Sequence, residues 1–246
     1  MSEAPDLTID VEGLCKSYGE RQVVSGLSLQ VKRGEICGFL GANGSGKTTT
    51  IRMLCGLLLP DRGRGTCLGL DILKEAHLIR RQVGYMTQKF SFYEDLTVFE
   101  NLEISFPRGR NVTGALFWKR SEEIVARVNE VARMIFLGDH IDRLAETLSH
   151  GQKQWLEIGM LLIQDPELLM LDEPVAGMSV SERTRTAELL ERVSKGRSVI
   201  VIEHDMKFVE SIADRVTVLH QGKVLAEGSM ADIQENAQVK AVYLGH

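Results

Sequence analysis

One stretch decides the fold of this chain: Gly41-Ala42-Asn43-Gly44-Ser45-Gly46-Lys47-Thr48. The six residues before it, Glu35 to Leu40, are short and apolar enough for a buried strand, and Thr48 to Leu59 has apolar residues at helical spacing. Glycines allow backbone angles that a side chain would block, so consecutive N–H groups can point at an anion near the positive end of the helix. The stretch therefore predicts a phosphate-binding loop between a strand and a helix.

Two side chains of this loop suit a nucleotide and its metal ion. Lys47 would reach the β- and γ-phosphates, and Thr48 would offer its hydroxyl to Mg²⁺. A glycine-rich turn can match the pattern by accident, but the strand and helix on either side argue against this. The candidate phosphate-binding residues are Gly41, Asn43, Gly44, Ser45, Gly46, Lys47, Thr48 and Thr49.

Two later apolar runs end in residues suited to phosphate chemistry. Leu168 to Leu171 ends at Asp172 and Glu173, and Ser198 to Ile202 is followed by His204 after one residue. Asp172 would hold the metal through its water shell, and Glu173 would act as the general base toward the attacking water. If the sheet is parallel, His204 lies at the same edge and senses the γ-phosphate. Acidic residues after a strand are also common as helix caps, and an isolated histidine is more often structural.

Together with Leu148-Ser149-His150-Gly151-Gln152, these motifs resemble the nucleotide-binding subunit of an ABC transporter, from about Leu7 to Gly228. The resemblance implies that ATP and Mg²⁺ are the cofactors and that Tyr18 stacks on adenine. It implies that Gln88 touches Mg²⁺ and water, and that Ser149, Gly151 and Gln152 cover the ATP of a second cassette. Glu173, His204, Lys47 and Gln88 are thus the candidate catalytic residues. The candidate metal ligands are Thr48, Gln88 and Asp172.

The chain departs from the family pattern at two positions. His150 stands where glycine is usual, and Ser179 stands where the family commonly has an aspartate after the catalytic glutamate. That aspartate lies in the loop that contacts the opposite subunit. The second departure therefore bears on communication between two sites more than on hydrolysis.

The two halves of the chain resemble different branches of the family. Residues 7–96 look like ATPases of multidrug-type exporters, whereas the residues from about Phe99 onward look like urea and branched-chain amino-acid importers. We hypothesise a mosaic, natural or engineered, joined near Thr97 to Glu103.

Composition and periodicity predict a single α/β domain with two lobes. The chain has 246 residues, 43% of them hydrophobic, and strands alternate with helices from Glu35 onward. Leu7 to Val11 and Val23 to Val31 predict an antiparallel β flap, and Ile124, Val128, Val131 and Ile135 predict an inserted helix. With the resemblance, this is a P-loop NTPase core of RecA-like type. The expected cassette covers residues 1–246, with the core lobe in 1–89 and 164–246 and the helical lobe in 90–163.

The expected partners are a membrane permease and a second cassette, in a homodimer or a heterodimer. No apolar run approaches the roughly 20 residues that span a bilayer, so any membrane role depends on a partner. The resemblance implies a cytoplasmic protein that is peripheral on the cytoplasmic face of the cell membrane. A net charge of −5 argues against a nucleic-acid partner. The basic and aromatic residues of 108–120 predict a solvated face or, as a weaker alternative, contact with a permease or lipid. A soluble ABC switch protein and a recombinant cassette without a permease are the competing interpretations.

Overall fold

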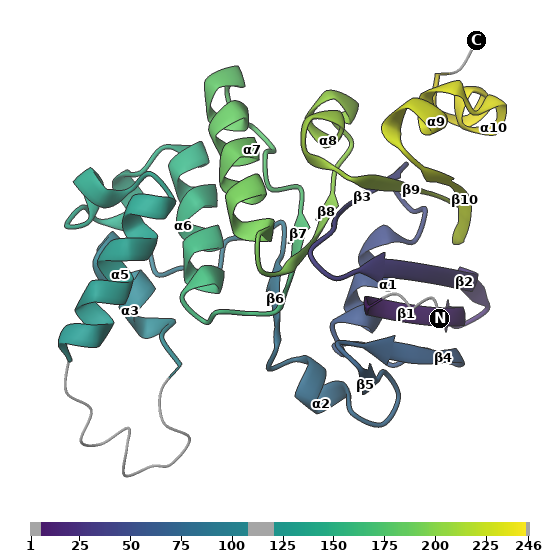
Figure 1. Cartoon of the computed structure of the whole chain (residues 1–246), viewed down its shortest axis with the longest axis horizontal. Helices are drawn as coiled ribbons and strands as arrows, with labels where there is room; N and C mark the ends of the chain where they lie inside the picture. Colours follow the sequence, from purple (N-terminus) through teal and green to yellow (C-terminus); the bar gives the residue numbers. More distant parts are fainter. Residues whose placement is uncertain (1–5, 108–120, 245–246) are drawn as a thin grey trace. The chain divides into compact units, whose positions relative to one another are not determined.

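The computed structural model describes residues 6–107 and 121–244, in two compact units (Figure 1). The first unit comprises Met1–Tyr85, Glu167–Pro174 and Leu190–His246. The second comprises Met86–Pro166 and Val175–Leu189. The basic and aromatic stretch of 108–120 lies outside the described residues.

A six-stranded sheet in the order β10-β9-β3-β8-β7-β6 carries the first unit. β3 pairs in parallel with β8 and β9, and β7 pairs in parallel with β8, while β10 is antiparallel to β9. β3, β7 and β8 are buried at every position, as expected for parallel strands that are covered on both faces. Their bounds are β3 Ile36–Gly41, β6 Val83–Met86, β7 Leu168–Asp172, β8 Ser198–Ile202, β9 Arg215–His220 and β10 Lys223–Gly228.

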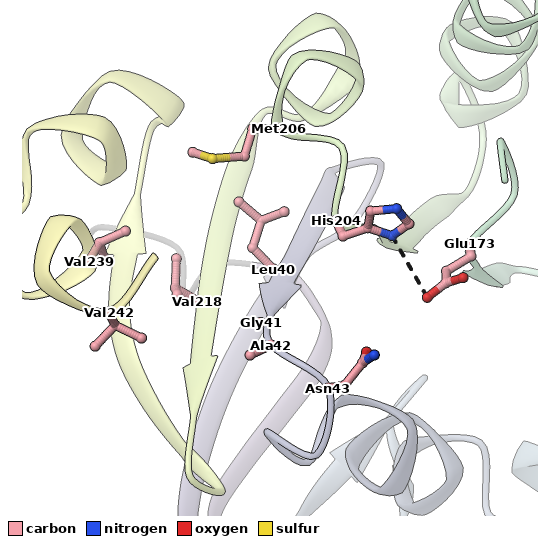
Figure 2. Close-up of a pocket in the computed structure, with 10 residues that line it drawn as sticks. All are labelled: Leu40, Gly41, Ala42, Asn43, Glu173, His204, Met206, Val218, Val239 and Val242. Atoms are coloured by element: carbon pink, nitrogen blue, oxygen red, sulfur yellow. Dashed lines mark ion pairs between the residues drawn. The ribbon is translucent and has the colours of Figure 1, made fainter. Parts of the chain in front are cut away.

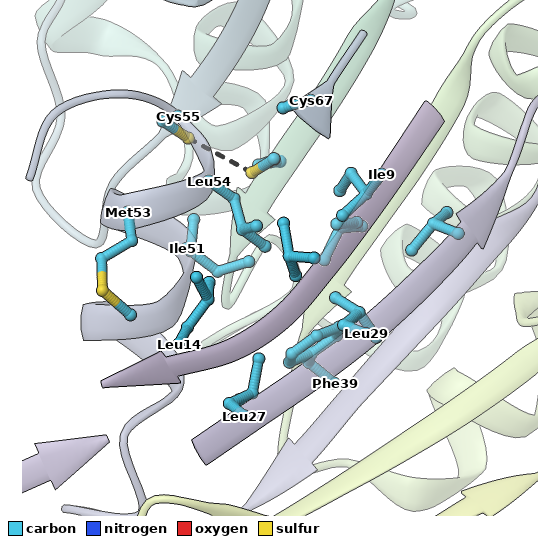
Figure 3. Packing of buried hydrophobic residues seen from close by; sticks show 14 of the residues in the cluster. Ile9, Leu14, Leu27, Leu29, Phe39, Ile51, Met53, Leu54, Cys55 and Cys67 are labelled. Carbon is cyan, nitrogen blue, oxygen red and sulfur yellow. Dashed lines mark hydrogen bonds between the residues drawn. The ribbon is translucent and has the colours of Figure 1, made fainter. Parts of the chain in front are cut away.

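A second, four-stranded sheet forms the predicted antiparallel flap, in the order β2-β1-β4-β5. Alternate residues of β2 are buried, so one face of this sheet meets the core. The strands are β1 Leu7–Tyr18, β2 Arg21–Lys32, β4 Arg62–Cys67 and β5 Leu70–Asp71. Figure 3 shows how this face packs on helix α1 (Lys47–Leu54), with Ile9, Leu14 and Leu27 facing Ile51 and Leu54 in one fully buried cluster.

The helix after the phosphate loop is shorter than the sequence predicts. It ends at Leu54 rather than Leu59, because Gly56 takes a left-handed φ of 69° and the backbone of Ala76 lies close to it. A Cβ at Gly56 would lie 2.5 Å from the Ala76 carbonyl oxygen. Leu57 and Leu59, which the periodicity assigned to the helix, are each 52% exposed.

Short helices complete the first unit. They are α2 Ala76–Ile79, α8 Met206–Ile212, α9 Met230–Glu235, α10 Ala237–Val239 and the π-helical turn η3 Lys240–Leu244. Val239 packs with Met230 and Ile233 in a small cluster that also contains Val216 and Val218 of β9. The C-terminal helices thereby extend the core beyond β10.

The second unit consists mainly of helices and connecting loops in its described residues. α5 buries Ile124, Val128 and Val131 on one face, as their spacing predicts, and Ser121 caps its N-terminus. The elements are α3 Val98–Ile104, α5 Glu122–Met134, η1 Gly138–His140, η2 Ala145–Thr147, α6 His150–Leu162 and α7 Val180–Ser194, the last as far as Leu189. Within 6–107 and 121–244, no helix is both long and apolar enough to cross a bilayer.

Candidate functional site

The loop between β3 and α1 is shaped to surround an anion. Gly44 and Gly46 have φ angles of 78° and 101°, a region that disfavours side chains. A Cβ at Gly46 would lie 2.9 Å from the Val23 carbonyl oxygen. Gly46 is the N-cap of α1. No side chain of the described residues caps this helix, and its first turn has no acidic residue. The first N–H groups of α1 are therefore available to a negatively charged ligand.

Lys47 lies folded over this loop. Its Nζ donates to the carbonyl oxygens of Gly41, at 2.5 Å, and Ala42, at 3.1 Å. Burial lowers the pKa of the lysine, and the nearby carboxylates of Asp172 and Glu173 act in the opposite direction. A partly desolvated ammonium group in this place interacts with phosphate more strongly than one in water would.

The opposite side of the loop has polar atoms that fit a divalent cation. Thr48 Oγ1 donates to Asp172 Oδ2 over 3.4 Å. Asp172 Oδ1 and Ser45 Oγ are buried and have no hydrogen-bond partner among the described residues. Burial, followed by repulsion from Glu173, raises the pKa of Asp172. One hydroxyl and one carboxylate suit Mg²⁺, which usually takes few protein ligands and completes its shell with water and phosphate oxygens.

Glu173 and His204 face one another at the carboxyl end of the sheet (Figure 2). His204 Nδ1 lies 3.8 Å from Glu173 Oε1 and 3.8 Å from Glu203 Oε2, and the histidine side chain is 71% exposed. Glu173 has a left-handed φ of 56°, although it is not a glycine, and its N–H donates to the Ile202 carbonyl oxygen at 2.9 Å. Such backbone strain concentrates at functional sites.

A cavity of about 640 Å³ joins these groups to the phosphate loop (Figure 2). Gly41, Asn43, Glu173 and His204 line its polar side. The other side is apolar and is formed by Leu40, Met206, Val218, Val239 and Val242. The predicted meeting of three strand ends at one edge is therefore present in the first unit.

Two predicted residues are not among those named as lining the cavity. Tyr18 ends β1, and its side chain is 51% exposed, so its ring is accessible for stacking. Gln88 belongs to the second unit, where it is exposed in a bend after β6. The roles of both residues stay predictions.

The signature segment, Leu148 to Gln152, begins helix α6 of the second unit. Ser149 Oγ accepts from Gln152 N at 3.2 Å, and Gln152 Oε1 accepts from Ser149 N at 3.0 Å. This reciprocal capping box confirms the predicted N-cap. The helix begins at His150, directly after its cap residue and two residues before the predicted start.

Sequence reasoning missed Glu182, which contacts the same region. Its Oε2 accepts from Ser179 N at 2.8 Å, and Ser149 Oγ donates to its Oε1 at 3.5 Å. The spacing Ser179-x-x-Glu182 is a capping-box pattern and could have indicated the first of these contacts. The positive φ of Glu173 was also missed, and no sequence pattern signals it.

Comparisons with known proteins agree with the geometry. The ABC transporter family matches residues 24–176, and the family described as branched-chain amino acid ATP-binding cassette transporter matches residues 223–246. The lipopolysaccharide export system ATP-binding protein of Haemophilus influenzae is 34% identical over 243 residues, covering 96% of this chain and 97% of that protein. The daunorubicin/doxorubicin resistance ATP-binding protein of Streptomyces peucetius is 35% identical over 237 residues, covering 96% and 69%. A crystal structure of an ATP-binding cassette of an ABC transporter, in its ADP conformation, superposes with a TM-score of 0.82 at 28% identity. The superposition covers 98% of this chain and 99% of that one. This similarity confirms the predicted fold class.

Proposed function

The chain belongs to the ABC transporter family as an ATP-hydrolysing subunit, and we propose that Lys47, Thr48, Asp172, Glu173 and His204 carry the reaction. The supporting observation is the meeting of the phosphate loop, Asp172 and the Glu173–His204 pair at one sheet edge. Asp172 Oδ1, which has no hydrogen-bond partner in the part of the chain that the structure describes, lies in this cluster. A buried carboxylate oxygen without a partner is costly unless a ligand completes it.

Each group has a distinct role in this proposal. Gly44, Ser45 and Gly46 present the backbone of the loop to the phosphates, and Lys47 faces the β- and γ-phosphates. Thr48 and Asp172, with Gln88, would hold Mg²⁺, which supplies charge neutralisation at the phosphate oxygens when it is bound.

Hydrolysis requires a group that orients water and accepts its proton. Glu173 fits this role because it lines the cavity beside the phosphate loop and its side chain, which faces His204, is partly exposed. His204 lies next to it and would contact the γ-phosphate. Tyr18 would stack on the adenine.

Cassettes of this family dimerise and work with a membrane permease, and we propose the same for this chain. Ser149, Gly151 and Gln152 of one subunit would cover the phosphates held by Lys47 of the other. The subunits would be two copies of this chain or one copy and a relative. We place the assembly at the cytoplasmic face of the cell membrane, where the permease selects the cargo.

The mosaic hypothesis also stays a proposal. The match of residues 223–246 to a branched-chain amino acid transporter family supports an importer-like C-terminal part. A separate search with each half that finds one natural family matching both equally well would contradict the mosaic hypothesis.

The test of the proposed function is Glu173→Gln. The substituted side chain keeps the shape of the glutamate but cannot accept a proton, so ATP binds and closes the dimer while turnover falls by about a hundredfold or more. Size-exclusion chromatography with and without Mg²⁺ and ATP measures the dimer, and phosphate release measures turnover. Glu235→Gln, at an exposed position of α9, is the control and keeps wild-type turnover. Unchanged turnover in Glu173→Gln would refute the assignment of the base.

A further inference from the structure

We propose that Glu182 is a positioning residue that holds the signature segment against the interface loop, Val175 to Ser179, so that both reach the partner cassette as one body. This inference rests on the proposed function, because the two segments matter only if they meet a second subunit. All of the contacts that carry it lie within the second unit.

The carboxylate of Glu182 contacts the first residues of two helices. Its Oε2 accepts from the backbone N of Ser179 at 2.8 Å and from the Ser179 hydroxyl at 2.7 Å. Its Oε1 accepts from the Ser149 hydroxyl at 3.5 Å. Ser179 precedes α7 and Ser149 caps α6, so one side chain joins both N-termini.

Electrostatics favour a charged carboxylate at this position. Helix N-termini carry partial positive charge, and Glu182 lies near two of them. The hydrogen bonds from Ser179, with smaller contributions from Ser149 and His150, lower the pKa of Glu182. The side chain is therefore ionised at neutral pH, and its hydrogen bonds are charge-assisted.

Gly151 of the signature segment leaves room for the carboxylate of Glu182. A Cβ at this position would lie too close to Oε1 and Cδ of Glu182, so the carboxylate would have to turn away. The glycine thus lets the carboxylate reach the start of α6. The close approach indicates that α6 and Glu182 are fitted to one another.

His150 makes a second contact between the same segments. Its Nε2 lies 3.0 Å from the Ala176 carbonyl oxygen, at hydrogen-bonding distance. Gly177 has a φ of 69°, and a Cβ there would lie 3.0 Å from the His150 ring. The ring also lies 5.4 Å from that of Phe90. The histidine therefore fills space against the interface loop that a glycine at position 150 would leave open.

The two departures from the family pattern are explained together by this arrangement. Ser179, in place of the usual aspartate, supplies a hydroxyl to Glu182, and His150, in place of the usual glycine, contacts the interface loop. An aspartate at position 179 would place a second carboxylate beside Glu182, and like charges at that distance repel. The interface loop has no carboxylate at position 179, but its Ser179 binds the carboxylate of Glu182 instead.

The experiment compares Glu182→Ala with Glu182→Gln. Glu182→Ala removes the carboxylate that contacts the signature segment, so the segment can move. Because small misplacements of catalytic groups are costly, we expect the kcat of this variant to fall by about tenfold. KM for ATP should stay within about twofold, because the subunit's own phosphate loop is untouched. Glutamine at the third helical position also completes a capping box, so Glu182→Gln should recover most of the lost kcat. Glu188→Ala, at an exposed position of the same helix, is the matched control and should keep wild-type kinetics.

The outcomes separate this inference from the proposed function. If the wild type releases no phosphate from ATP, the proposed function fails. If the wild type is active and Glu182→Ala has the same kcat, this inference alone fails. A fall in kcat that Glu182→Gln does not recover would also overturn it, because the capping contacts would then not be responsible.

A second variant covers the case in which Glu182→Ala does not fold. Ser179→Ala removes one donor to Glu182 and leaves the backbone N–H, so kcat should fall below that of the wild type while KM stays unchanged. Faster amide exchange of residues 149–152 in this variant supports the inference, and exchange equal to that of the wild type contradicts it.

Discussion

The charged carboxylate of Asp172 suits a bound cation, but it lowers the stability of the folded protein when no cation is bound. It is 3% exposed at the end of β7, with one oxygen near Thr48 and the other without a hydrogen-bond partner in the described part of the chain. Its raised pKa means that the folded protein binds a proton there more tightly than the unfolded chain does. The destabilising effect of the charge is therefore absent below the ordinary pKa of an aspartate, and it develops as the pH rises through the raised pKa of Asp172.

Asp172→Asn should therefore stabilise the protein in the absence of nucleotide. The melting temperature should rise by a few degrees at pH 7.5, and the gain should shrink toward pH 4, where the wild-type carboxyl is protonated. Mg²⁺ with ATP should raise the melting temperature of the wild type but not of the variant. Scanning calorimetry at several pH values measures both effects, with Asp139→Asn at an exposed position as the control. A lower melting temperature in Asp172→Asn at pH 7.5 would contradict this account.

At the scale of the element, two serines provide a matched pair. Ser121 caps α5 and Ser149 caps α6, and both helices have 13 residues in the same unit. Each hydroxyl accepts from the backbone N three residues later, at 3.3 Å in α5 and 3.2 Å in α6. The two hydroxyls therefore make the same local cap contact. Ser149 also donates to Glu182 and takes part in a capping box with Gln152, and it has a predicted role toward a partner.

Ser121→Ala and Ser149→Ala should each lower the free energy of unfolding by about 1 kcal/mol, the usual effect of losing an N-cap. Only Ser149→Ala should reduce ATP turnover, because Ser149 also contacts Glu182 and would meet the partner's phosphates. Urea denaturation and phosphate release, measured on the same samples, separate the two effects. Equal losses of turnover in both variants would show that α6 contributes only to stability.

Sequence patterns predicted elements well where local chemistry decides their ends. β3, β7 and β8 are apolar runs that end at, or just before, a glycine or a carboxylate, and Ser149 was predicted as the cap of α6. The end of α1 depends on Gly56 packing against Ala76, which is 20 residues later in the chain. The spacing of apolar residues carries no information about such a contact. The strained φ of Glu173 and the contact of Glu182 with Ser149 arise in the same way, from tertiary packing.

At the scale of the whole molecule, the chain holds the parts of two half-sites. Lys47 with Asp172 and Glu173 lies in the first unit, and Ser149 with Glu182 lies in the second. If each complete site takes one half from each of two copies, a defect in one half can be compensated by the other copy. This property distinguishes a shared site from one that a single subunit completes.

Lys47→Ala and Ser149→Arg should therefore each be inactive alone and regain activity when mixed. Lys47→Ala removes the charge that faces the phosphates, and Ser149→Arg places a bulky side chain at the start of α6. In a mixed dimer, the intact phosphate loop of Ser149→Arg meets the intact signature segment of Lys47→Ala. Equal mixing gives such dimers half of the time with one competent site each, or about a quarter of the wild-type sites.

Phosphate release by the two variants, separately and mixed, measures this recovery. The control is Lys47→Ala mixed with a double Lys47→Ala and Ser149→Arg variant, which should stay inactive. Mixtures no more active than the separate variants, at concentrations where Glu173→Gln dimerises on ATP, would contradict a site shared between two copies of this chain.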